Sequence, residues 1–237
     1  MEKEILSIQK IPSIIWGTPS NKVIIAIHGS MSNKADIPIE ILAKIALSKG
    51  YQVFSFDLPE HGDRKDDERL CKVQECVDDL TTMMQYAKER WSEISLFANS
   101  MGAYFSLLAY QNETIDKALF LSPVVDMERI IENMMHWFEI SEERLEKEEI
   151  IPTPIGQTLY WDYYCYVKEH PIKNWNIDTF ILYGDKDDMC EKDTISGFVE
   201  KHNCELQVVE ECEHYFHTSY QLHILETWLK NIINGGD

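Results

Sequence analysis

The sequence predicts an α/β fold: a mostly parallel central sheet with helices on both faces. Short apolar runs alternate along the chain with longer amphipathic stretches, which is the pattern of strands joined by crossover helices. The run from Val23 to Ile27 is apolar at every position, as expected for a central strand that is covered on both faces. A chain of 237 residues fits one domain of this kind.

The first half of the chain contains the clearest alternation. The apolar-rich stretch after Asp36 and Pro38 ends at Gly50 and links two buried strands into one βαβ unit. Along residues 70–91, apolar side chains recur every three or four positions and form one stripe on a long helix. The expected order is edge strands at 4–8 and 13–16, a strand at 23–27, a helix between 36 and 50, a strand at 52–56, a helix at 70–91, a strand at 93–98, a helix at 100–110 and a strand at 117–121.

The alternation is interrupted between Pro123 and Pro171. A helix from Met127 to Phe138, the acidic run EERLEKEE and the aromatic cluster LYWDYYCY occur there without a convincing strand. We interpret residues 123–171 as a small helical lid, inserted into a core made of residues 1–122 and 172–237. The core resumes with predicted strands at 179–183 and 205–209 and predicted helices at 191–202 and 218–233.

Composition and charge disfavour several classes of protein. The 22 basic and 41 acidic residues give a net charge of −19, which repels nucleic acid phosphates and anionic lipids, so neither nucleic acid nor membrane is an expected partner. The first ten residues do not resemble a secretory signal, and no apolar run is long enough to span a bilayer. The six cysteines lack metal-site spacing, so we expect reduced thiols in the cytoplasm and no metal or other cofactor.

A serine lies between a predicted strand and a predicted helix, in the sequence LFANSMGAYFS. The small residues Ala98 and Gly102 flank Ser100, as a sharp strand-to-helix turn requires where two backbones come close together. This segment resembles the nucleophile elbow of the α/β-hydrolase family, with Ala98 in the place of the first glycine of G-x-S-x-G. The resemblance implies the α/β-hydrolase fold and a nucleophilic Ser100, whereas the alternative is an ordinary helix N-cap serine.

The strand that ends at Ile27 continues into His28-Gly29-Ser30, which is similar to the family's H-G-x loop. In that family the backbone amides of this loop face the nucleophile and stabilise the negative charge of the tetrahedral intermediate. The resemblance assigns the amides of Ser30 and Met101 to this oxyanion hole. We expect His28 to be structural.

The turn DLPEHG, which begins at Asp57, is similar to the family's D-x-x-x-H-G turn. We expect Asp57 and His61 to hold this turn together and to take no part in catalysis.

Two downstream segments resemble the parts of the family that complete a catalytic triad. FILYGDKD resembles the strand and G-x-x-D segment that carries the acid, so Asp187 is the match, Asp188 is the alternative and Asp185 is a turn residue. HYFH resembles the histidine loop before the last helix, in which His214 is the general base and His217 is expected to cap that helix. The chain order serine, aspartate, histidine is the order of this fold.

The resemblance implies two-step acyl transfer on a small-molecule carboxylic ester. A thioesterase, amidase or peptidase would use the same groups, and this fold also includes non-catalytic ligand-binding proteins. We select Trp137, Phe138, Tyr160 and Trp161 as candidate substrate contacts, although packing within the lid explains most lid residues more simply. The apolar lid residues available to an acyl chain are Met134, Met135, Trp137, Phe138, Leu159, Tyr160, Trp161, Tyr163 and Tyr164. Neither the natural substrate nor the oligomeric state follows from the sequence.

Overall fold

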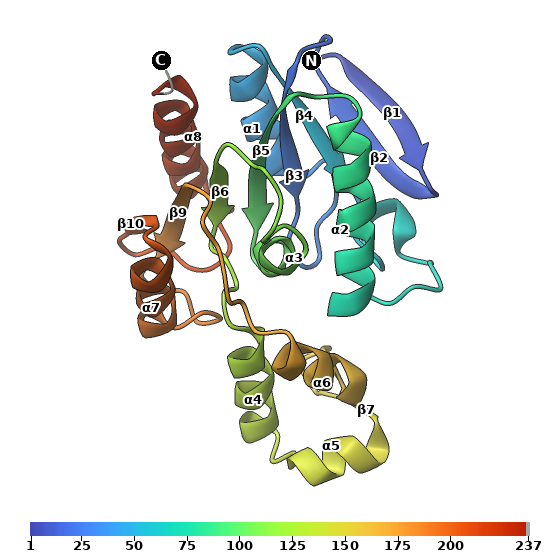
Figure 1. Cartoon of the computed structure of the whole chain (residues 1–237). Helices are drawn as coiled ribbons and strands as arrows, with labels where there is room; N and C mark the ends of the chain where they lie inside the picture. The colour runs from blue at the N-terminus through green and yellow to red at the C-terminus, as the bar shows by residue number, and fades with distance from the viewer. Residues whose placement is uncertain (236–237) are drawn as a thin grey trace.

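An eight-stranded sheet forms the centre of the described part of the chain, residues 1–235 of the computed structural model (Figure 1). Its strand order is β1-β2-β4-β3-β5-β6-β9-β10. The pairs β1/β2 and β2/β4 are antiparallel and the other pairs are parallel, which confirms the predicted, mostly parallel sheet. The strands are β1 (Lys3–Ile8), β2 (Ile11–Trp16), β3 (Lys22–Ile27), β4 (Tyr51–Phe56), β5 (Glu93–Asn99), β6 (Ala118–Leu121), β9 (Thr179–Gly184) and β10 (Glu205–Val209).

Only the first of the two predicted N-terminal edge strands lies at the edge. Strand β2 pairs with β1 on one side and with β4 on the other, so it is an internal strand. Gln9 and Lys10 both have positive φ, 48° and 73°, which is the backbone of a tight hairpin turn. Because this turn folds β1 back along β2, the outer position belongs to β1, where Ile5 is 77% exposed.

Helices cover both faces of the sheet, as predicted. One face carries α1 (Ile37–Leu47) and α8 (Ser219–Asn234), and the other carries α2 (Val73–Lys88), α3 (Met101–Ala109) and α7 (Lys192–His202) (Figure 1). Each group packs its apolar stripe on the sheet, which produces one cluster of buried side chains per face.

A separate group of elements joins β6 to β9. We call residues 123–171 the inserted segment; it contains α4 (Met127–Trp137), α5 (Glu142–Glu148), β7 (Ile150–Pro152), β8 (Thr158–Tyr160) and α6 (Trp161–Glu169). The antiparallel hairpin β7/β8 corrects the expectation that this region has no strand. Three-residue strands are too short to show an alternating pattern in a sequence.

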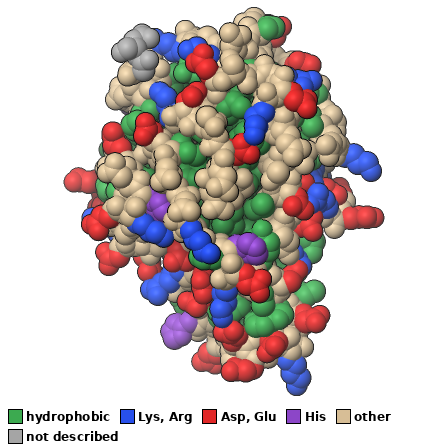
Figure 2. Space-filling model, in the orientation of Figure 1, with side chains coloured by type: hydrophobic (Ala, Val, Ile, Leu, Met, Phe, Trp, Pro, Cys, Tyr) green, Lys and Arg blue, Asp and Glu red, His purple; other side chains and the backbone are tan. Residues whose placement is uncertain are grey.

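The inserted segment lies beyond the end of the sheet toward which the parallel strands point (Figure 1). That end is where sheets of this class collect their binding sites. No helix in residues 1–235 is both long enough and apolar enough to cross a bilayer. Acidic side chains are spread over the face shown in Figure 2, including the part below the sheet.

Candidate active site

Ser100 occupies a strained turn between β5 and α3. Its φ and ψ are 53° and −123°, a backbone conformation that costs a non-glycine residue on the order of 1 to 3 kcal/mol. Two backbone hydrogen bonds hold this conformation: the Ser100 amide donates to Leu121 O at 3.0 Å, and the Val124 amide donates to Ser100 O at 3.1 Å. The surrounding strand ends therefore keep Ser100 in a position that its own backbone disfavours.

Gly102 is required at this turn because α3 approaches β3 closely. A Cβ atom at residue 102 would lie 2.5 Å from the carbonyl oxygen of His28. Ala98, at the place of the family's first glycine, is fully buried in β5, where its methyl group fits. An alanine at residue 98 therefore fits the fold in place of the first glycine of G-x-S-x-G. A larger residue in place of Gly102 would not fit.

The side chains of Ser100, His214 and Asp187 form a continuous chain of hydrogen bonds. Ser100 Oγ lies 2.8 Å from His214 Nε2, and His214 Nδ1 lies 2.7 Å from Asp187 Oδ2. Because a carboxylate only accepts hydrogen bonds, Nδ1 is the nitrogen that carries a proton, and Nε2 remains free to accept the hydroxyl proton of Ser100. This tautomer is the one that can activate a serine hydroxyl.

The carboxylate of Asp187 is held on both oxygens. Its Oδ1 accepts hydrogen bonds from the amides of Met189 and Cys190, each at 2.9 Å, while Oδ2 faces the imidazole. The side chain is fully buried. Of the neighbouring candidates, Asp188 is exposed, and the Asp185 amide donates to the carbonyl of Val209 in the turn after β9.

A close backbone contact brings the aspartate and histidine loops together. A Cβ at Gly184, the last residue of β9, would lie 2.2 Å from the carbonyl oxygen of Cys212. The Lys186 amide also donates to this oxygen at 2.8 Å. The glycine thus permits the loop before His214 to pack directly on the loop that contains Asp187.

A cavity of about 280 Å³ opens beside Ser100. Ser30 and Met101, whose amides were predicted to form an oxyanion hole, both line it. Met101 is the first residue of α3, and the first amides of a helix have no acceptor within the helix. An amide at this position, at the positive end of the helix dipole, is suited to bind a developing negative charge.

His28 is buried beneath the cavity and is held by two hydrogen bonds. Its Nδ1 donates to Gly29 O at 2.7 Å, and its Nε2 accepts from the Leu58 amide at 3.1 Å. Burial lowers the pKa of His28 to about 4, so the ring is neutral at pH 7. These contacts connect the loop after β3 to the turn after β4, which matches the structural role expected for His28.

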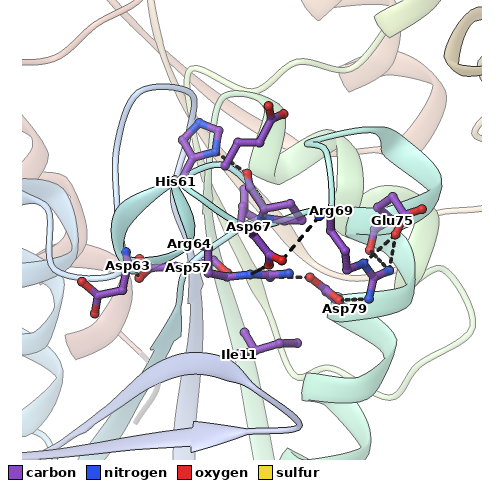
Figure 3. A network of polar contacts seen from close by, with 12 residues as sticks. Ile11, Asp57, His61, Asp63, Arg64, Asp67, Arg69, Glu75 and Asp79 are labelled. Atoms are coloured by element: carbon purple, nitrogen blue, oxygen red, sulfur yellow. Dashed lines mark hydrogen bonds and ion pairs between the residues drawn. The ribbon is translucent and has the colours of Figure 1, made fainter.

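Asp57 holds the turn after β4. It accepts hydrogen bonds from the Lys34 amide at 2.8 Å, from Lys34 Nζ at 2.5 Å and from the Asp63 amide at 2.9 Å. Close by, Arg64 pairs with the buried carboxylate of Asp79 on α2 at 2.5 Å (Figure 3). The loop that carries His61 is therefore attached both to the loop between β3 and α1 and to α2.

The structure brings one of the four candidate substrate contacts of the inserted segment to the cavity and leaves the other three away from it. Tyr160 lines the cavity beside Ser100, whereas Trp137, Phe138 and Trp161 do not. Trp137 is 58% exposed, and Phe138 and Trp161 pack against the core. The remaining residues of the inserted segment that line the cavity are Val124, Met127, Ile130, Ile131, Met134, Gly156, Gln157, Thr158, Leu159 and Tyr163.

Several cavity residues were not anticipated from the sequence. The positions 127, 130 and 131 fall on one face of α4 together with Met134, which was expected, so helical spacing is a signal that identifies this stripe. Glu60, His61, Cys71 and Met189 also line the cavity, but they come from irregular loops for which no periodic signal exists.

The expected role of His217 needs a correction. Thr218 caps α8, in a capping box with Gln221, and His217 lies outside it. The His217 ring stacks on Tyr215, with the ring centroids 4.9 Å apart. A threonine hydroxyl accepts a hydrogen bond from the third helical amide readily, which explains why the cap falls one residue later than expected.

The sheet order, the strained serine turn and the triad-like hydrogen bonds define the class as an α/β hydrolase. Residues 18–149 match a family model described as "Serine aminopeptidase, S33". This match covers more than half of the chain, so the chain belongs to that family of α/β hydrolases. No curated protein sequence matches the chain significantly.

Solved structures of low sequence identity share the fold. Est1E from Butyrivibrio proteoclasticus, with ferulic acid bound, is 16% identical over 98% of both chains, with a TM-score of 0.79. Alpha/beta hydrolase domain-containing protein 10 from mouse is 15% identical over 100% of both chains, with a TM-score of 0.78. The Pyrococcus furiosus esterase Pf2001 is 18% identical, over 98% of this chain and 88% of the other, with a TM-score of 0.68.

Proposed function

We propose that this α/β hydrolase cleaves carboxylic esters through Ser100, His214 and Asp187, with a covalent acyl-enzyme intermediate. The observation that carries the proposal is the pair of hydrogen bonds that joins these side chains, at 2.8 Å and 2.7 Å. The three residues come from separate loops at the carboxyl ends of β5, β9 and β10. An uncharged hydroxyl next to a correctly oriented imidazole has no evident structural purpose, but it is what nucleophilic catalysis requires.

In the first half-reaction, His214 Nε2 accepts the hydroxyl proton while Ser100 Oγ attacks the ester carbonyl carbon. The buried carboxylate of Asp187 stabilises the imidazolium that forms. The amides of Ser30 and Met101 bind the oxyanion, and each such donor contributes about 3 to 4 kcal/mol to transition-state stabilisation. The imidazolium then protonates the leaving alcohol, and the acyl group remains on Ser100.

In the second half-reaction, a water molecule takes the place of the alcohol. His214 removes a proton from the water as it attacks the acyl-enzyme, and then returns that proton to Ser100 Oγ when the carboxylic acid leaves.

The inserted segment supports an apolar acyl group as the substrate moiety, and we propose that it acts as a lid. Ile131, Met134, Leu159 and Tyr163 offer aliphatic and aromatic surface to the cavity that contains Ser100. We therefore propose a neutral ester with a short or medium acyl chain. The ferulic acid bound to Est1E suggests an aromatic acyl group as a further candidate.

A fluorophosphonate probe and an ester panel test this function. We expect covalent labelling at Ser100 and turnover of p-nitrophenyl acetate, butyrate or octanoate, with neither in the Ser100→Ala variant. Methyl ferulate tests the aromatic alternative. A folded Ser100→Ala variant that retained turnover, or a label on another residue, would overturn the proposal.

A second candidate, an aminopeptidase activity, is favoured by the family description and by one residue of the cavity. Glu60 places a carboxylate in the cavity that contains Ser100, where it can attract the ammonium group of a peptide. The Cys71 amide donates a hydrogen bond to Glu60 Oε2 at 2.6 Å. Glu60→Gln keeps an oxygen that can accept this hydrogen bond and removes only the negative charge, so the variant separates the two functions. An aminopeptidase would lose turnover of aminoacyl p-nitroanilides in this variant, whereas an esterase would keep its turnover of neutral esters.

A further inference from the structure

Two cysteine thiols lie against each other at the wall of the Ser100 cavity. The Sγ atoms of Cys71 and Cys76 are 3.7 Å apart, and both thiols are free. Cys76 is in the first turn of α2 and is fully buried, whereas Cys71 precedes the helix, is half-buried and lines the cavity. A small molecule that enters the cavity can therefore reach Cys71 first.

An imidazole is placed to remove the proton of Cys71. The side chain of His61 lines the same cavity as Cys71, and although burial lowers the pKa of its ring, the neighbouring thiol and the Pro59 carbonyl raise this pKa overall. His61 Nδ1 lies 2.7 Å from the carbonyl oxygen of Pro59, which can only accept, so Nδ1 carries a proton and Nε2 is left for the thiol. The hydroxyl of Ser100 has its own base in His214, so the Cys71 and His61 pair is not needed for the ester reaction.

The two thiols differ in their acidity. The contact with Cys76 and the neighbouring imidazole of His61 lower the pKa of Cys71 by more than burial raises it, whereas burial raises the pKa of Cys76. Cys71 is accordingly the more acidic of the two thiols, and Cys76 is the one that keeps its proton more strongly. A reactive thiolate beside a protonated partner thiol is the usual arrangement of an attacking and a resolving cysteine.

We propose that Cys71 and Cys76 are a peroxide-reactive thiol pair that forms a reversible disulfide in the wall of the Ser100 cavity. The oxidant is hydrogen peroxide or an organic hydroperoxide. In the first step His61 takes the Cys71 proton, the thiolate attacks one peroxide oxygen, an S–O bond forms and the O–O bond breaks. The released hydroxide or alkoxide takes the proton from His61, and Cys71 is left as a sulfenic acid.

In the second step the Cys76 sulfur attacks the Cys71 sulfur. The S–S bond forms, the S–O bond breaks, and the departing hydroxide takes the Cys76 proton and leaves as water. Two thiols lose two electrons in total, and the peroxide gains them. A dithiol reductant reverses the change by thiol–disulfide exchange.

Closing the disulfide requires the two sulfur atoms to approach by roughly 2 Å, to the bond length of about 2.05 Å. Cys71 lies in the irregular segment before α2, so it can move without unwinding the helix. The next residue, Lys72, pairs with Asp162 of α6 at 2.8 Å. Movement of Cys71 therefore changes both the cavity wall and the contact with the inserted segment, and we expect ester turnover to fall; this consequence rests on the proposed function.

Peptide mapping tests the disulfide without any activity measurement. Trypsin cleaves after Arg69, Lys72 and Lys88, so Cys71 and Cys76 fall on separate peptides. After treatment of the whole protein with hydrogen peroxide and alkylation, we expect peptide 70–72 to be linked to peptide 73–88. Dithiothreitol should release the two peptides.

Three variants identify the roles of the thiols. In Cys76→Ser, Cys71 should accumulate as a sulfenic acid that dimedone traps. In Cys71→Ser, Cys76 should remain unmodified at the same peroxide exposure. Cys165→Ser is the matched control, because Cys165 is a partly exposed thiol of the inserted segment that has no role in the pair, and it should form the linkage as the unaltered protein does.

The outcomes are separable from those for the proposed function. Oxidation of Cys165 before Cys71, or a linkage of Cys71 to any other cysteine, would overturn the thiol pair. Turnover of p-nitrophenyl butyrate should fall on oxidation and return with dithiothreitol; a disulfide with unchanged turnover would overturn the effect on the cavity. A protein with no turnover before oxidation would contradict the ester function, and peptide mapping would still decide the disulfide.

Discussion

The carboxyl edge of the sheet and the inserted segment build two sides of the same cavity in different ways. At the sheet edge, Ser100, Asp187 and His214 are held by backbone contacts, buried hydrogen bonds and glycines with no space for a side chain. The inserted segment contributes mainly apolar side chains, from α4 and the β7/β8 hairpin, and one backbone hydrogen bond, from the Val124 amide to Ser100 O.

At the sheet edge, the structure fixes the positions of individual atoms. In the inserted segment, it requires only that the side chains facing the cavity are apolar. A proton transfer needs donor and acceptor within hydrogen-bond distance, so the sheet edge has little tolerance for substitution. An acyl pocket tolerates changes of shape, because apolar contact is non-directional. The following predictions test this division, from the largest expected effect to the smallest.

Ser100→Ala removes the proposed nucleophile and should lower kcat for p-nitrophenyl esters by about 10⁶-fold, because the remaining groups provide only binding and oxyanion stabilisation. Steady-state and burst kinetics measure the effect. Circular dichroism and thermal unfolding serve as the control for folding. A loss of less than tenfold would show that the sheet edge is not the catalytic region.

Asp187→Asn should lower kcat by about 10⁴-fold, because the amide group can donate to His214 and so favours the wrong imidazole tautomer. Asp188→Asn is the matched control, since its side chain is exposed and the substitution should leave kcat within twofold, roughly. If kcat fell equally in the two variants, the hydrogen bond between Asp187 and His214 would not be what distinguishes the two aspartates.

The third prediction concerns the free energy of unfolding and the buried His28 at the sheet edge. Its pKa of about 4 in the folded protein is below the ordinary value of 6.5, so between these pH values the unfolded chain binds a proton that the folded protein does not. The free energy of unfolding is therefore unaffected by this group above pH 6.5. As the pH falls toward 4, it should decrease by about 3 kcal/mol.

Urea unfolding of the unaltered protein and of His28→Asn, measured at several pH values over this range, checks the effect. The variant is expected to be less stable at pH 7 but to lose less of its stability on acidification. Identical slopes of unfolding free energy against pH would show that His28 does not contribute.

The inserted segment should respond more weakly and more selectively. Met134→Ala removes a side chain from the cavity wall and should lower kcat/KM for an octanoate ester about tenfold relative to the acetate. Trp137→Ala, one turn along the same helix and 58% exposed, should leave that ratio unchanged. The measurement is a comparison of kcat/KM across acyl lengths. An equal effect of the tryptophan variant would mean that the cavity residues do not define the acyl site.

Local patterns were sufficient to predict the strand and the helix on either side of Ser100. Ser100 lies between a run with the character of a buried strand and an amphipathic helix, with small residues on both sides, and all of these are properties of neighbouring residues. The elements on both faces of the sheet were predictable for the same reason, because periodicity reports which side of an element is buried. Boundaries shifted by a few residues: α2 begins at Val73 and not at residue 70, and α8 begins at Ser219, after the Thr218 cap.

By itself, the amino-acid sequence determined the α/β fold, the serine turn and the chain order of Ser100, Asp187 and His214, since each depends on short-range spacing and on small residues at defined places. Only the tertiary structure decided that Asp187, not Asp188, meets His214, that Met134 and not Trp137 faces the cavity, and that Cys71 touches Cys76 beside it. Those choices depend on how loops from distant parts of the chain pack against one another, and a linear pattern contains no information about the surface that an element will meet.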